Sequence, residues 1–238
     1  MNIRLITFDL DNTLWDAHPV LRRAETAQRQ WLLEHRPGTI EHHDHNSLSA
    51  IKQAVVQQQP QLCHNVSALR LTVLKALQQA AGYSELQAAT GATEAYAIFM
   101  QERQRVVLYD GVLDVLSQLA GHYRLGALTN GNADIYKTDA ASYFDFALLA
   151  ENVGRAKPAP DMFETALEQA GVSAREAIHV GDHIEHDIAG AKAVGMHTIW
   201  LNQVGACLDD SQPPDQEVHS LQELPTAVAA IATTVDNR

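Results

Sequence analysis

The sequence has little cysteine, an excess of acidic over basic residues and no long apolar run. Cys63 and Cys207 are the only cysteines, and neither has zinc-site or redox-motif spacing, so we expect a reducing cytoplasm. Seventeen basic against twenty-nine acidic side chains give a formal net charge of −12, which opposes nucleic acid and anionic membranes as partners. The apolar run at residues 5–8 is too short for a signal peptide or membrane span. We therefore expect a soluble, unexported protein.

Short apolar segments alternate with helical patterns over much of the chain. Residues 5–8 end abruptly at Asp9, and residues 125–128 follow a helical pattern that begins at Val112. Such alternation predicts an α/β fold with a Rossmann-like, doubly wound parallel sheet. Further strands are expected at residues 146–149, 177–180 and 198–200, and further helices near 160–170, 185–194 and 221–232.

Residues 17–106 differ from the rest, because they are rich in Gln and Ala, have helical periodicity and contain no convincing strand pattern. We therefore expect two domains. Residues 1–16 and 107–238 would form the sheet-based core, and residues 17–106 would form an inserted helical module.

Three helices can be predicted within the inserted module. The first would begin near Pro19 and stop at Pro37-Gly38. Another, residues 66–80, would stop before Gly82. Ser84 with Gln87 would form a capping box for the third. The expected buried positions are Leu21, Ala24 and Trp31 in the first helix, Val66, Leu69, Val73, Leu77 and Ala80 in the second, and Ala92, Tyr96, Phe99 and Met100 in the third.

Polar residues follow four segments of the predicted core. In a doubly wound sheet, ligands bind outside the carboxyl ends of the strands, so side chains at those ends should lie close together. These residues are Asp9 and Asp11, Thr129 and Asn130, Lys157, and Asp182 with Asp187.

Two aspartates separated by one residue can take different roles at one strand end. An ionised Asp9 could attack phosphorus and form an aspartyl phosphate. A carboxylate repels a phosphate dianion, and a hard cation removes that barrier. Mg²⁺ prefers oxygen ligands, and Asp182 would supply the other protein carboxylate. The sequence therefore predicts a magnesium site at this edge.

The remaining side chains suit the transfer of a phosphoryl group. The Thr129 hydroxyl and the amide of Asn130, beside an expected helix start, would grip the phosphoryl oxygens. Lys157 would neutralise a further oxygen. Asp11, beside the other carboxylates, would be the general acid and base. Asp187 would hold Lys157 or a metal-bound water.

These motifs resemble those of the haloacid dehalogenase-like hydrolases. The resemblance implies a magnesium-dependent phosphatase acting on a small phosphorylated metabolite. It also implies that the carboxylates of Asp9 and Asp182 and the backbone carbonyl of Asp11 hold the metal, and that residues 17–106 form a C1-type cap. The motifs are Asp9-Leu10-Asp11-Asn12-Thr13, Leu128-Thr129-Asn130, Lys157-Pro158, and Gly181-Asp182 to Asp187.

Other functions remain open on the sequence alone. An aspartate at position 11 resembles the phosphatase branch, since true dehalogenases do not carry the acid there, but sugar-phosphate mutases share it. A receiver domain that forms an aspartyl phosphate without turnover, or a silent phosphate-binding protein, is a possibility from another class. Trp15, His18 and Arg22 are candidate substrate contacts, with structural packing as the alternative. The oligomeric state is not indicated.

Overall fold

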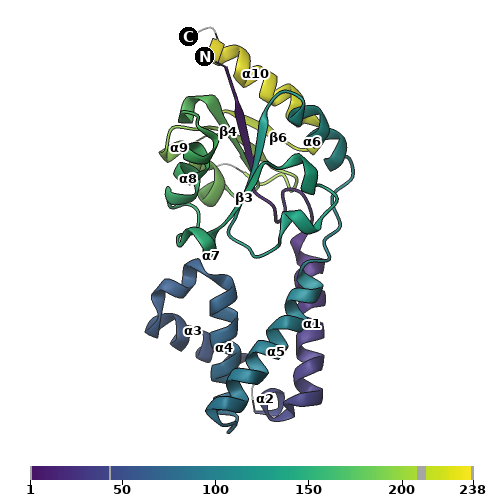
Figure 1. The fold of residues 1–238 in the computed structure, drawn as a ribbon, viewed down its shortest axis with the longest axis vertical. Helices are drawn as coiled ribbons and strands as arrows, with labels where there is room; N and C mark the ends of the chain where they lie inside the picture. The colour runs from purple at the N-terminus through teal and green to yellow at the C-terminus, as the bar shows by residue number, and fades with distance from the viewer. Residues whose placement is uncertain (1, 43, 208–212, 237–238) are drawn as a thin grey trace. The chain divides into compact units, whose positions relative to one another are not determined.

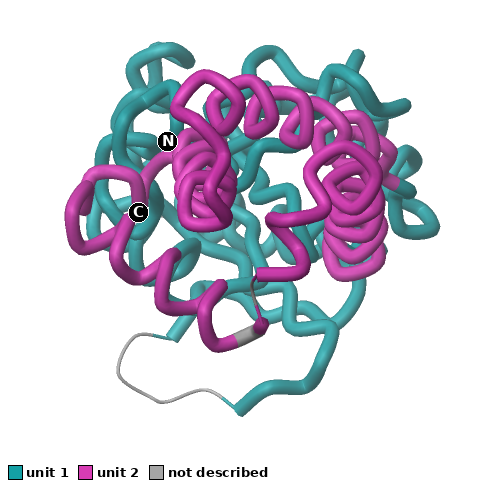
Figure 2. Tube along the Cα trace, turned by 90° about the horizontal axis from the view of Figure 1, so that it is seen from below, with its two compact units in different colours: residues 1–16, 107–238 teal, residues 17–106 magenta. Residues whose placement is uncertain are grey.

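The computed structural model describes residues 2–42, 44–207 and 213–236. The chain divides into two compact units (Figure 2): Met1–Asp16 with Val107–Arg238, and Ala17–Val106. The first unit contains the sheet, and the second is built from helices. The assignment of the second unit as a cap remains a prediction.

The first unit is built around a six-stranded parallel sheet with the order β3-β2-β1-β4-β5-β6. The first strand lies near the centre, and the chain winds outward from it in both directions, so the predicted doubly wound fold is confirmed. The strands are β1 (Leu5–Phe8), β2 (Arg124–Thr129), β3 (Phe146–Leu149), β4 (Ala177–Gly181), β5 (His197–Leu201) and β6 (Gln216–Val218).

Helices cover both faces of this sheet (Figure 1), which explains why its central strands are buried on both sides. On one face, α8 packs on β2 and β3, and α9 packs on β5. On the other, α6 contacts β2, and α10 contacts α6, β5 and β6. The α-helices are α6 (Val112–Ala120), α7 (Ala150–Val153), α8 (Asp161–Ala170), α9 (Gly190–Ala193) and α10 (Leu224–Asp236). The short 3₁₀-helices are η2 (Ile135–Lys137), η3 (Ala141–Tyr143), η4 (Ala174–Glu176) and η6 (Leu221–Glu223).

Two core elements differ from the sequence-based expectation. The short edge strand β6 was not predicted, because its residues lack an apolar alternation. The helix expected at residues 185–194 begins instead as a π-helix, η5 (Ile184–Ala189), before α9. Its wide first turn coincides with two local hydrogen bonds: the carboxylate of Asp187 accepts from the His183 N–H, and His183 Nδ1 accepts from the His186 N–H.

The described residues of the second unit form helices only, as expected. As predicted, the first helix, α1 (Ala17–His35), begins near Pro19 and stops before Pro37-Gly38. The short α2 (Pro37–Glu41), which begins at Pro37, was not predicted. The remaining elements are α3 (His45–Gln58), η1 (Pro60–His64), α4 (Val66–Ala80) and α5 (Glu85–Arg103).

The predicted bounds of α4 and the capping box of α5 are confirmed. The buried stripes are partly shifted from the predicted positions, because each helix packs against more than one neighbour. In α1 the buried apolar residues are Ala17, Val20, Ala24 and Leu32, with Leu21 and Trp31 only half-buried; in α4 they are Leu74 and Leu77, with Ala80 exposed. In α5, Ala92 and Phe99 are buried as predicted, and Tyr96 and Met100 are half-buried.

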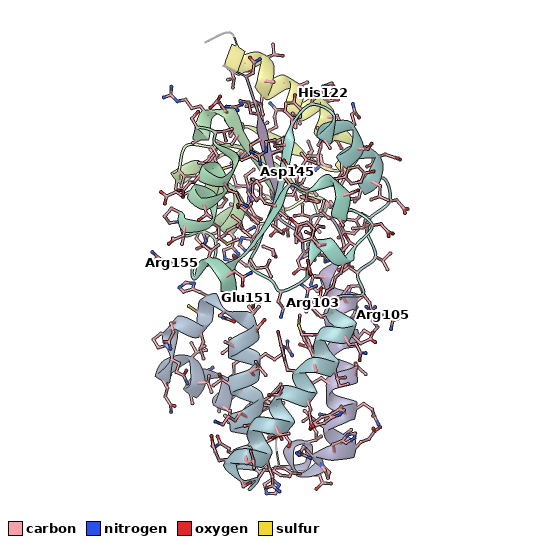
Figure 3. All side chains as sticks on the ribbon, viewed as in Figure 1. Arg103, Arg105, His122, Asp145, Glu151 and Arg155 are labelled. Atoms are coloured by element: carbon pink, nitrogen blue, oxygen red, sulfur yellow. The ribbon has the colours of Figure 1, made fainter. Side chains whose placement is uncertain are left out.

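The end of α5 alternates sharply between buried and exposed cations. Arg103 is almost completely buried, whereas Arg105, two residues later, is exposed (Figure 3). Arg105 and Arg23 both pair with Glu102, so the two long helices α1 and α5 are joined by charge as well as by packing.

Among the described residues, no helix has the length and apolar character needed to cross a membrane.

Candidate active site

The loop after β1 turns sharply and keeps Asp9 and Asp11 at the edge of the sheet. Asp9 continues the strand, since its N–H donates to the Val180 carbonyl at 2.8 Å. Asn12 then adopts a left-handed conformation with φ of 62°, which asparagine tolerates better than most residues. Its N–H donates to the Trp15 carbonyl at 2.7 Å and closes the turn. The local sequence therefore fixes both aspartates at a strand end.

Lys157 is the centre of the charged cluster. Its Nζ donates to Asp9 Oδ1 at 2.8 Å, to Asp187 Oδ1 at 2.6 Å and to the Leu128 carbonyl at 2.7 Å, which uses all three ammonium protons. Only 1% of the side chain is exposed. A buried cation bridging two carboxylates is thus held in one orientation.

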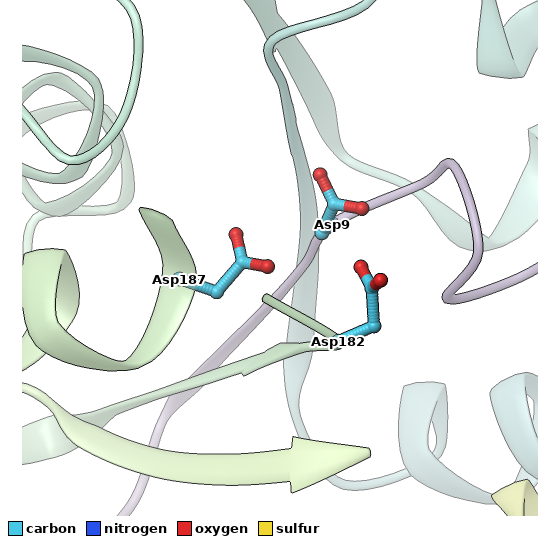
Figure 4. A group of neighbouring side chains, drawn as sticks. All are labelled: Asp9, Asp182 and Asp187. Atoms are coloured by element: carbon cyan, nitrogen blue, oxygen red, sulfur yellow. The ribbon is translucent and has the colours of Figure 1, made fainter. Parts of the chain in front are cut away.

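Three carboxylates gather at this point (Figure 4). Asp9, Asp182 and Asp187 each offer an oxygen, and these oxygens lie within 4.8 Å of one another. Both oxygens of Asp187 already accept hydrogen bonds, from Lys157, His179 and the His183 N–H. Asp187 is therefore engaged in holding Lys157, which leaves Asp9 and Asp182 as the carboxylates best placed for a cation.

The site carries more negative than positive charge. Burial raises the pKa of Asp9 to about 8; Lys157 opposes the rise, and Asp187 adds to it. Burial, with repulsion from Asp187, raises the pKa of Asp182 to about 6. For Asp187, the charge and hydrogen bonds of Lys157 and His179 outweigh burial and hold the pKa below its usual range.

This donor set fits a magnesium ion. Mg²⁺ binds one or two carboxylates together with water and phosphate oxygens, and Asp9 and Asp182 provide two close carboxylates. With Lys157 as the partner of Asp187, the other two aspartates lack a full counter-charge, and a divalent cation would supply it.

Asp11 interacts with a residue that was expected to contact substrate. Trp15 Nε1–H donates to Asp11 Oδ1 at 2.8 Å, and the Trp15 ring is completely buried. The indole is fully buried in the structure, and its role as a substrate contact stays a prediction. This hydrogen bond holds one oxygen of the Asp11 carboxylate.

A family model described as haloacid dehalogenase-like hydrolase matches residues 3–195. The chain belongs to the haloacid dehalogenase-like hydrolases. This confirms the family that the four motifs indicated, and with it an enzyme of the hydrolase class.

Relatives of this hydrolase include named phosphatases. The 5-amino-6-(5-phospho-D-ribitylamino)uracil phosphatase YigB of Escherichia coli (strain K12) is 33% identical over 95% of this chain and 96% of its own length. The N-acylneuraminate-9-phosphatase of Mus musculus is 29% identical over 96% of this chain and 95% of its own.

A solved structure described as 2-haloacid dehalogenase from Pseudomonas syringae pv. Tomato DC3000 is also similar. It has 42% identity and a TM-score of 0.92, and the match covers 96% of this chain and 99% of that one.

Thr129 and Asn130 lie at the end of β2, but not beside a helix. The expected helix start is absent, since residues 131–134 are irregular and Asp134 caps the short 3₁₀-helix η2 instead. The Asn130 side chain pairs with the backbone of Lys157 in both directions, at 2.8 and 2.9 Å. A helix dipole therefore does not contribute here, and Asn130 links the second and third motif loops.

The other two candidate substrate contacts belong to the helical unit. His18 and Arg22 are both exposed on α1, outside the unit that carries the aspartates. Their role as substrate contacts stays a proposal.

Sequence reasoning assigned no role to three buried polar residues of the site. Thr13 donates to Asp9 Oδ2 at 3.3 Å and to Asp182 Oδ1 at 3.4 Å, and so contacts both carboxylates. Thr7 and His179 form a hydrogen-bonded pair on neighbouring strands beneath Asp187. Thr13 stands inside the first motif, which could have signalled it. Thr7 and His179 gave no signal, because a polar residue within a short apolar strand reads as part of the core.

Proposed function

We propose that this hydrolase is a magnesium-dependent phosphomonoesterase that acts on a small phosphorylated metabolite. The observation that carries the proposal is the convergence of Asp9, Asp182 and Lys157 at one edge of the sheet. Named phosphatases among the full-length relatives support the same reaction class. Two free, exposed cysteines support a reducing cytoplasm as its location.

The proposed reaction has two steps. First, an Asp9 carboxylate oxygen forms a bond to phosphorus while the bond to the leaving oxygen breaks, and Asp11 gives that oxygen a proton. Then Asp11 takes a proton from water, the water oxygen attacks phosphorus, and the bond to Asp9 breaks, releasing phosphate. Trp15 supports this role of Asp11 by fixing one of its oxygens.

The other groups stabilise charge. Mg²⁺ held by Asp9, Asp182 and the Asp11 carbonyl would lower the repulsion between the nucleophile and the phosphate. The positive charge of Lys157 would offset negative charge near the phosphoryl oxygens, the Thr129 hydroxyl would face those oxygens, and Asp187 would keep Lys157 in place. The hydroxyl of Thr129 already accepts from the Gly131 N–H at 2.9 Å, so its proton is left for an acceptor.

The substrate would be selected outside the phosphate site. We propose residues 17–106 as the cap, with His18 and Arg22 as candidate contacts. The substrate in the name of the Escherichia coli relative, 5-amino-6-(5-phospho-D-ribitylamino)uracil, is the first compound to test, because that relative matches nearly the whole chain.

The test is phosphate release from a panel of phosphorylated metabolites with Mg²⁺. Asp9→Asn should abolish release without altering the fold, because the amide is a poor nucleophile. Asp145→Asn is a matched control, since Asp145 is an aspartate of the same unit whose carboxylate pairs with Arg124 at the amino ends of β2 and β3, away from the cluster. Full activity of Asp9→Asn would end the proposal.

A second candidate function is dehalogenation, which the structure from Pseudomonas syringae favours through its 42% identity. Both reactions use an aspartate nucleophile, so they are separated by product: chloride from a 2-chloroacid, or phosphate from a monoester. Isomerised sugar phosphate would indicate a mutase, and a stable phosphoprotein without turnover would indicate a receiver-like switch. The carboxylate of Asp11 beside Asp9 favours phosphate release, because an alkoxide leaving group needs a proton.

A further inference from the structure

A buried chain of hydrogen bonds lies beneath the proposed site. Thr7 on β1 and His179 on β4 are register partners, and Thr7 Oγ1 lies 2.8 Å from His179 Nδ1. On the other side of the ring, His179 Nε2 lies 3.3 Å from Asp187 Oδ1. Thr7 and His179 are 0% exposed and Asp187 is 1% exposed, so no solvent competes for these groups.

This chain of hydrogen bonds fixes one tautomer of the His179 imidazole. Both oxygens of Asp187 act as acceptors in this site, so His179 Nε2 must carry the proton and donate it. Nδ1 is then an acceptor, and the Thr7 hydroxyl at 2.8 Å donates to it in preference to the more distant Ile178 carbonyl at 3.4 Å. Each polar atom of the ring thus has a complementary partner.

Packing fixes the ring as well. The Phe163 ring meets the His179 ring edge to face, with centroids 5.1 Å apart. On the same strand as His179, Gly181 leaves the space that Asp187 occupies, because a Cβ there would lie 2.3 Å from Asp187 Cγ. The carboxylate of Asp187 is therefore confined by a glycine on one side and oriented by the imidazole on another.

This chain of hydrogen bonds ends at Asp9, the proposed nucleophile. Asp187 Oδ1 accepts from both His179 and Lys157, and Lys157 continues to Asp9 Oδ1. A neutral imidazole is suited to this place, since it adds a donor to Asp187 without adding a charge that competes with Lys157. Burial and the nearby Lys157 lower the pKa of His179, although Asp187 opposes this, which agrees with a neutral ring.

We infer that His179, anchored by Thr7, is a positioning residue that holds Asp187 so that Lys157 can bridge it to Asp9. This inference rests on the proposed phosphatase function. The partner residues of a site commonly change activity by about 10–100-fold when they are removed, although they touch no substrate.

The kinetic test uses four variants with p-nitrophenyl phosphate and Mg²⁺. His179→Leu removes the donor, and His179→Gln restores an N–H toward Asp187. In His179→Leu we expect kcat to fall about 10–100-fold, with KM changed less than about threefold. In His179→Gln kcat should recover most of that loss. Thr7→Val should lower kcat by a smaller factor, about three- to tenfold, because the ring keeps its donor but loses its anchor.

Thr198→Val is the matched control. Thr198 is the register partner of His179 on the opposite strand, is 0% exposed and bonds to Asp215 instead of the site. Thr198→Val should have a lower melting temperature than wild type, as Thr7→Val should, but keep the wild-type kcat. A kcat within twofold of wild type in folded His179→Leu, or an equal kcat loss in Thr198→Val, would overturn the inference.

A measurement without turnover separates this inference from the proposed function. Long-range ¹H–¹⁵N correlation on the wild-type protein at pH 7 should show His179 as a neutral imidazole with its proton on Nε2. The opposite tautomer or a charged ring would overturn the positioning role even in an active phosphatase. A correct tautomer in a protein that releases no phosphate from any substrate would instead refute the proposed function.

Discussion

Replacing Lys157 with methionine tests how the charged cluster is held together. Methionine keeps the apolar part of the side chain and removes the charge. In the wild-type protein the Lys157 Nζ lies 2.8 Å from Asp9 Oδ1 and 2.6 Å from Asp187 Oδ1, with 1% of the side chain exposed. The variant therefore leaves two buried carboxylates without their shared cation.

The expected cost is large. Removing one partner of a buried ion pair destabilises a protein by about 3–5 kcal/mol, because the remaining charge stays buried without compensation. In a chain of this size each kcal/mol corresponds to about 2–4 °C in Tm. We expect Lys157→Met to lower Tm by roughly 6–20 °C at pH 8 in EDTA.

The deficit should be smaller at pH 5 than at pH 8. Lys157 holds the pKa of Asp187 below its usual range, and it opposes the rise in the pKa of Asp9. Without Lys157 both folded-state pKa values move up. The folded variant then binds protons that the unfolded chain has already released, so its stability is lost as pH rises.

The assay is thermal unfolding by circular dichroism at the two pH values. Lys75→Met is the control, because Lys75 pairs with Glu85 on the surface of the helical unit and such pairs contribute about 0–1 kcal/mol. A Tm within about 2 °C of wild type, or an equal deficit at both pH values, would refute the view that Lys157 acts by compensating buried charge.

Three further predictions concern other parts of the chain. Trp15→Phe removes the N–H that donates a hydrogen bond to Asp11, the proposed general acid, so kcat should fall about tenfold in a folded protein; an unchanged kcat would contradict this. Gly91→Ala would put a Cβ 2.1 Å from Gln78 Oε1 and cost about 1–3 kcal/mol by chemical denaturation, whereas Gly121→Ala, with its nearest atom at 3.5 Å, should cost less. Because the pKa of Asp182 is raised to about 6, its proton must leave on metal binding, and Mg²⁺ affinity by calorimetry should strengthen from pH 5 to pH 7; constant affinity would argue against Asp182 as a ligand.

The part of the site that can be predicted from sequence is the part set by topology. The ends of parallel strands meet at one edge, so polar residues at the ends of short apolar segments converge whatever the details of the loops. Asp9 and Asp182 follow this rule, whereas Lys157 reaches the same edge from the loop after α7, and the structure brings the three together.

The part that cannot be predicted depends on register and on competing local hydrogen bonds. The helix expected after Asn130 does not form there, since Asp134 caps a later turn and the Asn130 side chain bonds to Lys157. The pairing of Thr7 with His179 exists only because β1 and β4 align those two residues. Neither strand carries a sequence pattern that specifies the register of its neighbour.

The charge balance of the cluster explains why these features occur together. Asp9, Asp182 and Asp187 carry three negative charges when ionised, and Lys157 supplies one positive charge. If His179 were charged, Asp187 would bind two cations and compete less strongly for Lys157, which would then be free to move toward Asp9. A neutral His179 keeps Lys157 shared between the two aspartates. When Asp9 and Asp182 are ionised, the remaining negative charge lies on these two aspartates, where a divalent cation would need it.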